Sequence, residues 1–533
     1  MSDDAQQPEA ATAAAAQVDQ IRRGYAFEGG ALVFGAAVVE GQAHPDAPVR
    51  VPLATLNRHG LVAGATGTGK TKTLQLMAEQ LSAQGVPVFL ADIKGDLSGM
   101  ASPGVANDRV TSRAQDVGQQ WSGTAYPTEF LSLGGLGAGI PVRATVTSFG
   151  PTLLSKVLGL NETQESSLGL VFHYADKNGL ALLDVKDLRA VIQHLTSDEG
   201  KADLKALGGL SSATAGVILR ELVTFSDRGA DVFFGEPEFD TADLLRTAPD
   251  GRGMVTCLEL PAVQDRPQLF STFLMWLLAD LFQDLPEVGD LDKPKLVFFF
   301  DEAHLLFDDA SKAFQDAIEQ TVRLIRSKGV GVFFVTQSPK DVPSDVLAQL
   351  GNRVQHALRA FTPDDAKALK AAVSTYPHTA YDLSKLLTSL GTGEAVVTVL
   401  SERGAPTPVA WTRMIAPQSL MAPSDPARVE ELIAASSLAA RYAAVADRES
   451  AYELLQARLA KAPAEDSRPA PAPAPGPEPA PSREPARRQP KEAPTVVEQV
   501  VQSSAFKSML RSAGTVIGRE ITRSIFGTAR RRR

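Results

Sequence analysis

A glycine-rich turn between an apolar run and a helical pattern constrains this fold most strongly. Residues 60–73 read GLVAGATGTGKTKT, with Gly64, Gly69, Lys70 and Thr71 at the spacing of a phosphate-binding loop. Glycines let the backbone curl so that successive amides face phosphate oxygens, and the amino end of the following helix favours negative charge. The sequence therefore predicts a site for a nucleoside triphosphate at this turn.

The roles of the individual loop residues follow from their chemistry. We expect Lys70 to reach the β- and γ-phosphates of ATP, and the Thr71 hydroxyl to bind Mg²⁺. The residues expected to cradle the nucleotide are Gly64, Ala65, Thr66, Gly67, Thr68, Gly69, Lys70 and Thr71.

Alternation of apolar runs and helical patterns predicts an α/β fold. The phosphate loop follows one apolar run and precedes a helical pattern at 71–84 and a second apolar run at 86–91, which together make one βαβ unit. Further strand-like runs occur at 253–260, 295–300, 330–335 and 393–400. We therefore expect a core built on a mostly parallel sheet.

Composition divides the chain into eight expected segments. Residues 150–230 have little strand signal, and 462–494 are dominated by Pro, Ala and charged residues, which favours an extended linker. The expected segments are a disordered leader (1–24), a short β-rich segment (25–60), the first part of the ATPase core (61–150), an all-α insertion (151–230), the second part of the core (231–420), a helical extension (421–461), a Pro/Ala-rich linker (462–494) and a disordered basic tail (495–533).

The overall composition indicates a soluble globular protein. The 533 residues include 44% hydrophobic and 22% charged side chains, and the one cysteine, Cys257, indicates a reducing compartment. The N-terminal stretch lacks the basic and apolar regions of a signal peptide. The apolar run at 273–282 is about half of the roughly 20 residues that cross a bilayer. We expect a cytoplasmic protein without a membrane span.

Two carboxylates at a strand end distinguish the expected chemistry from that of a kinase. Five apolar residues at 296–300 suit a strand buried on both faces, and Asp301 and Glu302 follow them directly. Asp301 is placed to hold Mg²⁺, and Glu302 to accept a proton from the water that attacks the γ-phosphate. A hydrolase needs that polarising group, so the sequence favours ATP hydrolysis.

Gln337 and two arginines are further candidate catalytic residues. Gln337 directly follows the strand-like run VGVFFVT, where an amide would hydrogen-bond the γ-phosphate or the lytic water, although a turn-forming role is the alternative. Arg323 and Arg326 share one face near a helix end. Either they complement the helix dipole, or one of them reaches a neighbouring subunit's nucleotide as an arginine finger.

The stretches GATGTGKT, ADIKGD, FFFDEAH and VGVFFVTQSP, in this order, resemble the HerA/FtsK superfamily of ring-forming DNA-pumping ATPases, most closely its bacterial HerA-like helicase branch. The resemblance covers about residues 25–420. It implies a RecA-like core, a hexamer with ATP between subunits, and DNA as the partner. By the same resemblance Lys70 and Thr71 are Walker A residues, Asp301 and Glu302 Walker B residues, and Gln337 the sensor. Arg323 or Arg326 resembles the trans arginine.

Two classes of function stay open. The first is an ATP-driven DNA translocase or helicase, which would contact mainly DNA phosphates. The second is an ATP-gated assembly or scaffold protein that does not move DNA.

The basic tail has three possible interpretations. A net charge of −9 gives no basic footprint over the whole chain, but residues 504–533 carry eight basic side chains against Glu520, a balance of +7. This segment is either a solvated terminus, a tethered contact for DNA, or a peripheral membrane contact through a loose apolar stripe.

Overall fold

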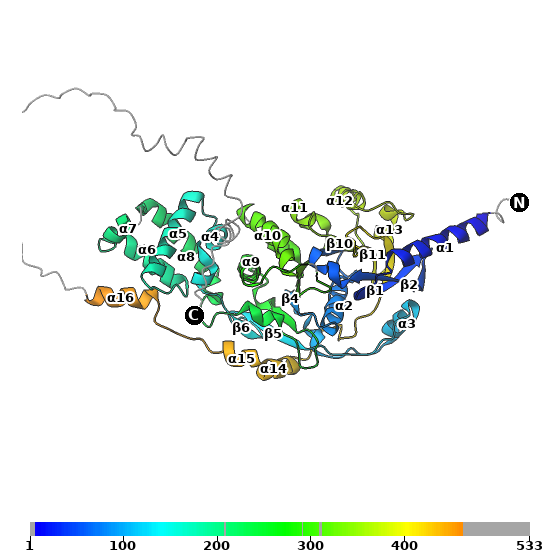
Figure 1. Cartoon of the computed structure of the whole chain (residues 1–533), viewed down its shortest axis with the longest axis horizontal. Coiled ribbons are helices and arrows are strands. Elements are labelled where there is room, and N and C mark those ends of the chain that lie inside the picture. Colours follow the sequence, from blue (N-terminus) through cyan, green and yellow to red (C-terminus); the bar gives the residue numbers. More distant parts are fainter. Residues whose placement is uncertain (1–5, 207–208, 290, 309–311, 462–533) are drawn as a thin grey trace, which may run out of the picture.

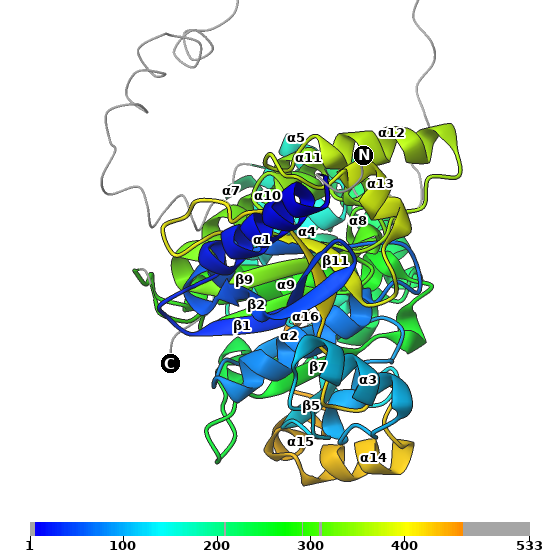
Figure 2. The same ribbon diagram turned by 90° about the vertical axis from the view of Figure 1, so that its right-hand side faces the viewer.

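A twelve-stranded sheet forms the centre of the described part of the protein (Figures 1 and 2). This computed structural model describes residues 6–461 except 207–208, 290 and 309–311. The strands, in their order across the sheet, are β2 (Gln42–Pro52), β1 (Ala31–Val39), β12 (Ala410–Met414), β11 (Glu394–Thr398), β10 (Asn352–Gln355), β3 (Gly60–Ala63), β9 (Val330–Thr336), β8 (Leu296–Phe300), β4 (Val88–Asp92), β7 (Val255–Glu259), β5 (Thr128–Leu133) and β6 (Ile140–Val142).

The strands from β10 to β6 pair in parallel, whereas those from β2 to β10 pair antiparallel. The parallel block contains β3, which leads into the phosphate loop, with β10 on one side and β9 and β8 on the other. Every residue of β8 and β9 is buried, as expected for strands covered on both faces. The α/β fold class predicted from the sequence, a RecA-like core with a mostly parallel sheet, is confirmed.

Helices cover both faces of the sheet and extend beyond one end of it (Figure 1). The helices are α1 (Gln6–Gly24), α2 (Lys70–Ala83), α3 (Asp108–Val117), α4 (Val146–Val157), α5 (Glu162–Lys177), α6 (Val185–Thr196), α7 (Lys201–Ala206), α8 (Ser212–Asp227), α9 (Pro267–Asp284), α10 (Lys312–Ile325), α11 (Ser344–Leu347), α12 (Pro363–Val373), α13 (Leu383–Ser389), α14 (Pro426–Ala435), α15 (Ser437–Tyr442) and α16 (Ala451–Lys461).

The N-terminal region differs from the disordered leader that its composition favours. Residues 6–24 form α1, which packs against β1 and β2, and Val18 and Ile21 are buried. Tyr25, directly after the helix, is also buried, and its hydroxyl oxygen lies 3.0 and 2.9 Å from the carbonyl oxygens of Val397 and Pro408, either of which can accept its one proton. Apolar side chains at helical spacing bury against the antiparallel strands, and this tertiary contact orders the alanine-rich segment.

Helices α4 to α8, which follow β6 and precede β7 in the sequence, form a bundle. Asn161 and Asp184 cap α5 and α6 through reciprocal side-chain and backbone hydrogen bonds, so the sequence sets where both helices begin. Apolar side chains of the bundle continue into one hydrophobic core with α9, α10 and one face of the sheet. The bundle therefore shares its interior with the sheet.

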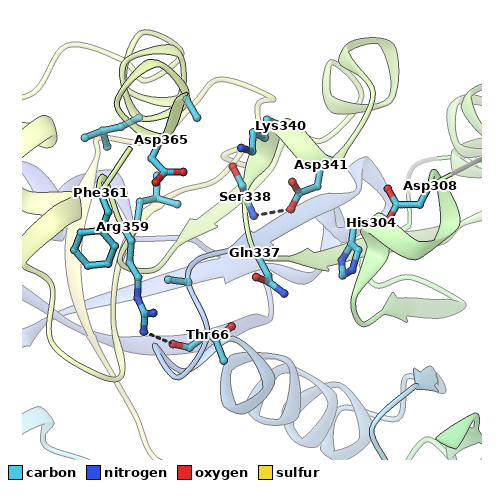
Figure 3. Close-up of a pocket in the computed structure, with 14 residues that line it drawn as sticks. Thr66, His304, Asp308, Gln337, Ser338, Lys340, Asp341, Arg359, Phe361 and Asp365 are labelled. Carbon is cyan, nitrogen blue, oxygen red and sulfur yellow. Dashed lines mark hydrogen bonds between the residues drawn. The ribbon is translucent and has the colours of Figure 1, made fainter. Parts of the chain in front are cut away.

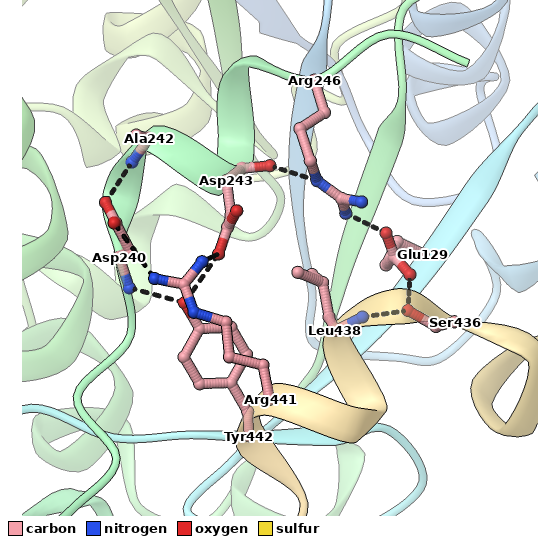
Figure 4. A network of polar contacts seen from close by, with 9 residues as sticks. All are labelled: Glu129, Asp240, Ala242, Asp243, Arg246, Ser436, Leu438, Arg441 and Tyr442. Atoms are coloured by element: carbon pink, nitrogen blue, oxygen red, sulfur yellow. Dashed lines mark hydrogen bonds and ion pairs between the residues drawn. The ribbon is translucent and has the colours of Figure 1, made fainter. Parts of the chain in front are cut away.

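The C-terminal strap, residues 426–461, joins the edge of the sheet to the bundle (Figure 1). Helix α14 contacts β5, α15 contacts β6, and α16 packs against α6. On β5, Glu129 accepts hydrogen bonds from Arg246 and from Ser436 of the strap (Figure 4).

A second polar cluster fixes the middle of the strap. Arg441 pairs with Asp240 and Asp243 at 3.2 and 2.8 Å, and the Tyr442 hydroxyl donates to Asp243 at 2.6 Å (Figure 4). These contacts join segments about 200 residues apart in the chain.

Two expectations concern membranes and the C-terminal tail. Within the described residues, no helix is both long enough and apolar enough to cross a membrane. The linker (462–494) and the basic tail (495–533) lie outside the described residues.

Candidate active site

Three neighbouring parallel strands end at the same edge of the sheet and bring the candidate residues together. Strand β3 ends at Ala63 before the phosphate loop, β8 ends at Phe300 before Asp301, and β9 ends at Thr336 before Gln337. The Gly64 amide donates to the Thr336 carbonyl at 3.2 Å, which joins the loop directly to the strand that carries Gln337. Ligands of parallel sheets bind at this carboxyl edge.

The phosphate loop occupies residues 64–69, and α2 begins at Lys70. Gly64, Gly67 and Gly69 have φ angles of 157°, 80° and 117°, in the region that favours glycine. The Lys70 ammonium donates to the Ala65 carbonyl at 3.2 Å, inside the turn. Burial lowers the pKa of Lys70, while the nearby carboxylates of Glu302 and Asp301 oppose that fall.

Asp301 and Glu302 are both buried at the end of β8. Burial raises the pKa of Asp301 to about 7, and the charge of Glu302 adds to the rise. Glu302 has a left-handed backbone, with φ of 46°, and its amide donates to Asp301 Oδ1 at 2.9 Å. A non-glycine residue rarely adopts this conformation, so the chain turns sharply at Glu302 and does not continue as an extended strand.

Lys94 holds the Glu302 carboxylate by an ion pair. Burial by itself raises the pKa of Glu302, but the hydrogen bond and charge of Lys94 outweigh it and hold the pKa below its usual value. His304 Nδ1 lies 3.3 Å from the other carboxylate oxygen of Glu302. Glu302 is therefore kept ionised, which is the form that accepts a proton.

The ADIKGD stretch positions Lys94. Asp92, at the end of β4, is buried and accepts the amides of Gly95 and Leu97 at 2.7 and 2.8 Å. These bonds fold the chain after β4 into a turn. Because β4 and β8 are adjacent strands, the turn places Lys94 beside Glu302.

A cavity of about 530 Å³ opens beside the phosphate loop (Figure 3). Gln337 lies in it between Thr66 and His304, and Arg359 donates to the Thr66 carbonyl at 3.3 Å. The side chain of Phe361, 84% exposed, also lines the cavity. The cavity therefore joins the loop to the sensor candidate.

Arg323 and Arg326 are not part of this cluster. Arg323 is in the last turn of α10, Arg326 is in the following turn, and both are exposed. They precede the amino end of β9, whereas Gln337 follows its carboxyl end. Neither arginine reaches the nucleotide site of its own chain, and a role in trans stays a prediction.

The residues at the strand ends fit a divalent cation held with a nucleotide. Asp301 Oδ2 is buried and has no hydrogen-bond partner among the described residues. The Thr71 hydroxyl lies in the first turn of α2. In the described part of the chain, no group of three or more His, Cys, Asp or Glu side chains is arranged to hold a metal. One carboxylate and one hydroxyl suit Mg²⁺ that takes its other ligands from phosphates and water.

Sequence reasoning missed Arg359 and Phe361 and left Lys94 without a role. Arg359 and Phe361 follow β10, and only the sheet order places that strand beside β3. Lys94 is 208 residues from its partner Glu302. The signal that could have singled out Lys94 was its position just after a strand in a glycine-containing turn.

Comparison with known proteins identifies the family. The profile of the helicase HerA-like C-terminal family matches residues 38–533. The DNA double-strand break repair helicase HerA of Sulfurisphaera tokodaii is 23% identical over 356 residues, which are 66% of this chain and 64% of that protein. A probable helicase of Methanocaldococcus jannaschii is 32% identical over 124 residues, 22% of each chain. The chain thus aligns with less than two thirds of the length of the HerA helicase.

Two solved structures illustrate the structural similarity. The plasmid coupling protein TrwB in complex with ADP and Mg²⁺ has a TM-score of 0.48 and 17% identity, and the match covers 75% of this chain and 97% of TrwB. VirB4 of Thermoanaerobacter pseudethanolicus has a TM-score of 0.44 and 15% identity, with 75% and 98% covered. The matched family profile and the phosphate loop lead to one conclusion: the chain belongs to the helicase HerA-like C-terminal family of P-loop ATPases.

Proposed function

We propose that this protein is an ATP-hydrolysing motor of the HerA/FtsK type that translocates or unwinds DNA as a hexameric ring. One observation carries the proposal: the phosphate loop with Lys70 and the buried carboxylates of Asp301 and Glu302 follow the ends of parallel strands at the same edge of the sheet. A phosphate-binding lysine, a metal-binding carboxylate and a second, ionised carboxylate are together the groups that hydrolysis of a γ-phosphate needs.

Each residue has a separate part in the reaction. The loop amides and Lys70 bind the β- and γ-phosphates of ATP. The water oxygen bonds to the γ-phosphorus while Glu302 accepts a proton from that water. The bond between the γ-phosphorus and the oxygen of ADP breaks, and ADP and phosphate are released. Gln337 orients the water or contacts the γ-phosphate from the adjacent strand end. Thr71 and Asp301 would hold Mg²⁺, which neutralises charge on the phosphates.

DNA is proposed as the partner on the basis of family membership. The related archaeal proteins are named as DNA repair helicases. A ring with ATP between subunits would let Arg323 or Arg326 reach a neighbour's γ-phosphate, and both are exposed. The alternative is an ATP-gated scaffold that assembles without moving DNA.

Two variants test the proposed chemistry. We expect Lys70→Ala to abolish tight ATP binding, because the ammonium holds phosphate. We expect Glu302→Gln to bind ATP normally and to lose turnover by about 10²–10⁴-fold, because an amide accepts no proton. Nucleotide affinity and steady-state phosphate release would be measured on both. Wild-type turnover in Glu302→Gln would refute its assignment as the base.

The same assay with DNA separates the two classes of function. Strong stimulation of hydrolysis by duplex DNA supports the motor. Hydrolysis that is indifferent to every nucleic acid, in a protein that assembles, supports the scaffold. Mass measurement in the presence of ATP gives the number of subunits.

A further inference from the structure

His356 is a completely buried histidine directly beneath the phosphate loop. It follows β10, and its amide donates to the carbonyl of Ala63, the last residue of β3, at 2.7 Å. The carbonyl of the next residue, Ala357, accepts the amide of Ala65 in the loop at 2.8 Å. The chain after β10 thus continues the pairing with β3 into the phosphate loop.

The imidazole joins two further segments. Nδ1 lies 2.8 Å from the carbonyl oxygen of Glu394, and Nε2 lies 2.8 Å from the hydroxyl of Thr73 in the first turn of α2. A carbonyl only accepts, so Nδ1 carries the proton and Nε2 accepts from the Thr73 hydroxyl. Burial lowers the pKa of His356 to about 4, which keeps this neutral tautomer near neutral pH.

Two of the three loop glycines, Gly64 and Gly69, face this side chain. A Cβ on Gly64 would lie 2.5 Å from the Cβ of His356, closer than van der Waals contact allows. A Cβ on Gly69 would lie 3.6 Å from Cε1 of the same ring. His356 therefore leaves no room for a side chain at Gly64, and a side chain at Gly69 would meet the same ring at ordinary contact distance.

A second support lies beside the histidine. The Gly393 amide donates to the Thr68 carbonyl of the loop at 3.0 Å. Arg113 of α3 donates to the carbonyls of Gly393 and Thr392 at 2.8 and 3.0 Å. Residues 392–393, just before β11, are thus bonded both to the phosphate loop and to α3. His356 forms a hydrogen bond with the residue that follows them, Glu394.

We propose that His356 is a positioning residue that holds the phosphate loop and the first turn of α2 in the geometry that binds β- and γ-phosphates. The inference deepens the proposed function and rests on it, since it presumes that the loop binds ATP. A loop that must order itself on binding loses affinity, whereas a preorganised loop does not. Loss of these contacts should therefore lower the affinity for nucleotides, and the loss should be larger for nucleotides that place more phosphates in the loop.

The main test compares affinities for ATP, ADP and AMP in the full chain with Mg²⁺. His356→Phe keeps a ring of similar size but removes both hydrogen bonds. It should lower the affinity for ATP and ADP by at least about tenfold, while the affinity for AMP should change little. In steady-state hydrolysis, KM for ATP should rise by a larger factor than kcat falls, because Glu302 is unchanged in the variant. A role in packing alone predicts equal affinities for wild type and variant once both are shown to be folded.

A matched pair at Thr73 keeps the inference testable even if His356→Phe does not fold. Thr73→Val removes the hydroxyl that donates to His356 and should weaken ATP measurably, whereas Thr73→Ser keeps the hydroxyl and should restore affinity. Equal ATP affinity in the two variants would overturn the inference.

A buried histidine away from the loop provides the control. His59 is also buried, and its Nδ1 accepts the Val332 amide at 3.0 Å in the interior of the sheet. His59→Asn should leave the ratio of ATP to AMP affinity unchanged, and an equal change in this ratio would refute a specific role for His356. If the wild type itself does not bind ATP, the proposed function is wrong and this inference falls with it. If the wild type binds ATP and the variants bind it equally well, only this inference is wrong.

Discussion

Protonation of buried His59 should destabilise the protein in mild acid. Burial lowers the pKa of His59 from 6.5 to about 4, and its Nδ1 accepts the Val332 amide. The unfolded chain therefore takes up the proton at a higher pH than the folded chain does. The stability contributed by neutral His59 is fully present above pH 6.5 and is lost as the pH falls toward 4. The difference in pKa corresponds to a loss of about 2 kcal/mol at pH 5 and about 3 kcal/mol at pH 4.

His59→Asn isolates this effect. His59 has φ of 58°, which Asn tolerates better than most residues, and the Asn carbonyl can accept the Val332 amide. The variant loses imidazole packing at every pH but has no proton to bind. The free energy of unfolding, from urea titrations followed by circular dichroism, should favour the wild type most at pH 7. This advantage should shrink by about 2 kcal/mol at pH 5. Buried carboxyl groups titrate in both proteins and cancel, so an advantage that stays constant with pH would refute the argument.

Three further predictions concern the proposed motor. If Arg323 or Arg326 acts in trans, mixed rings of an Arg→Ala variant and Glu302→Gln should regain hydrolysis above either variant alone, and mixed rings without recovery would reject the arginine tested. Truncation after Pro494 should flatten the salt dependence of DNA affinity, by roughly 0.9 in slope for each DNA phosphate that the tail neutralises, without changing DNA-free hydrolysis; an unchanged slope would reject a DNA contact by the tail. Lys94→Met removes the ion pair that lowers the pKa of Glu302, so the acidic limb of the kcat profile should move to higher pH, and an unmoved limb would exclude control by Lys94.

The sequence predicted the parts of the fold that are encoded locally. The phosphate loop combines a fixed glycine spacing with a strand before it and a helix after it, and the apolar run of β8 marks a strand covered on both faces. The fold class and the family followed from these patterns. A local pattern also placed Gln337 at a strand end, because an apolar run precedes it.

Other features depend on contacts between distant segments, which one sequence does not display. His356 supports the phosphate loop only because β10 lies beside β3, and Glu129 meets Ser436 across 307 residues. The helical α1 was missed because it is rich in alanine and has few large apolar side chains, a composition that also suits a disordered leader. Its few buried side chains become informative once the antiparallel strands that cover them are known.

The C-terminal strap also fixes the point from which the rest of the chain departs. Helix α16 ends at Lys461 and packs on α6 of the bundle. The 33 residues of segment 462–494 span at most about 115 Å when fully extended. Residue 495 therefore lies within that distance of the end of α16, because the covalent chain can reach no further. Each residue deleted from 462–494 would lower this upper limit by about 3.5 Å.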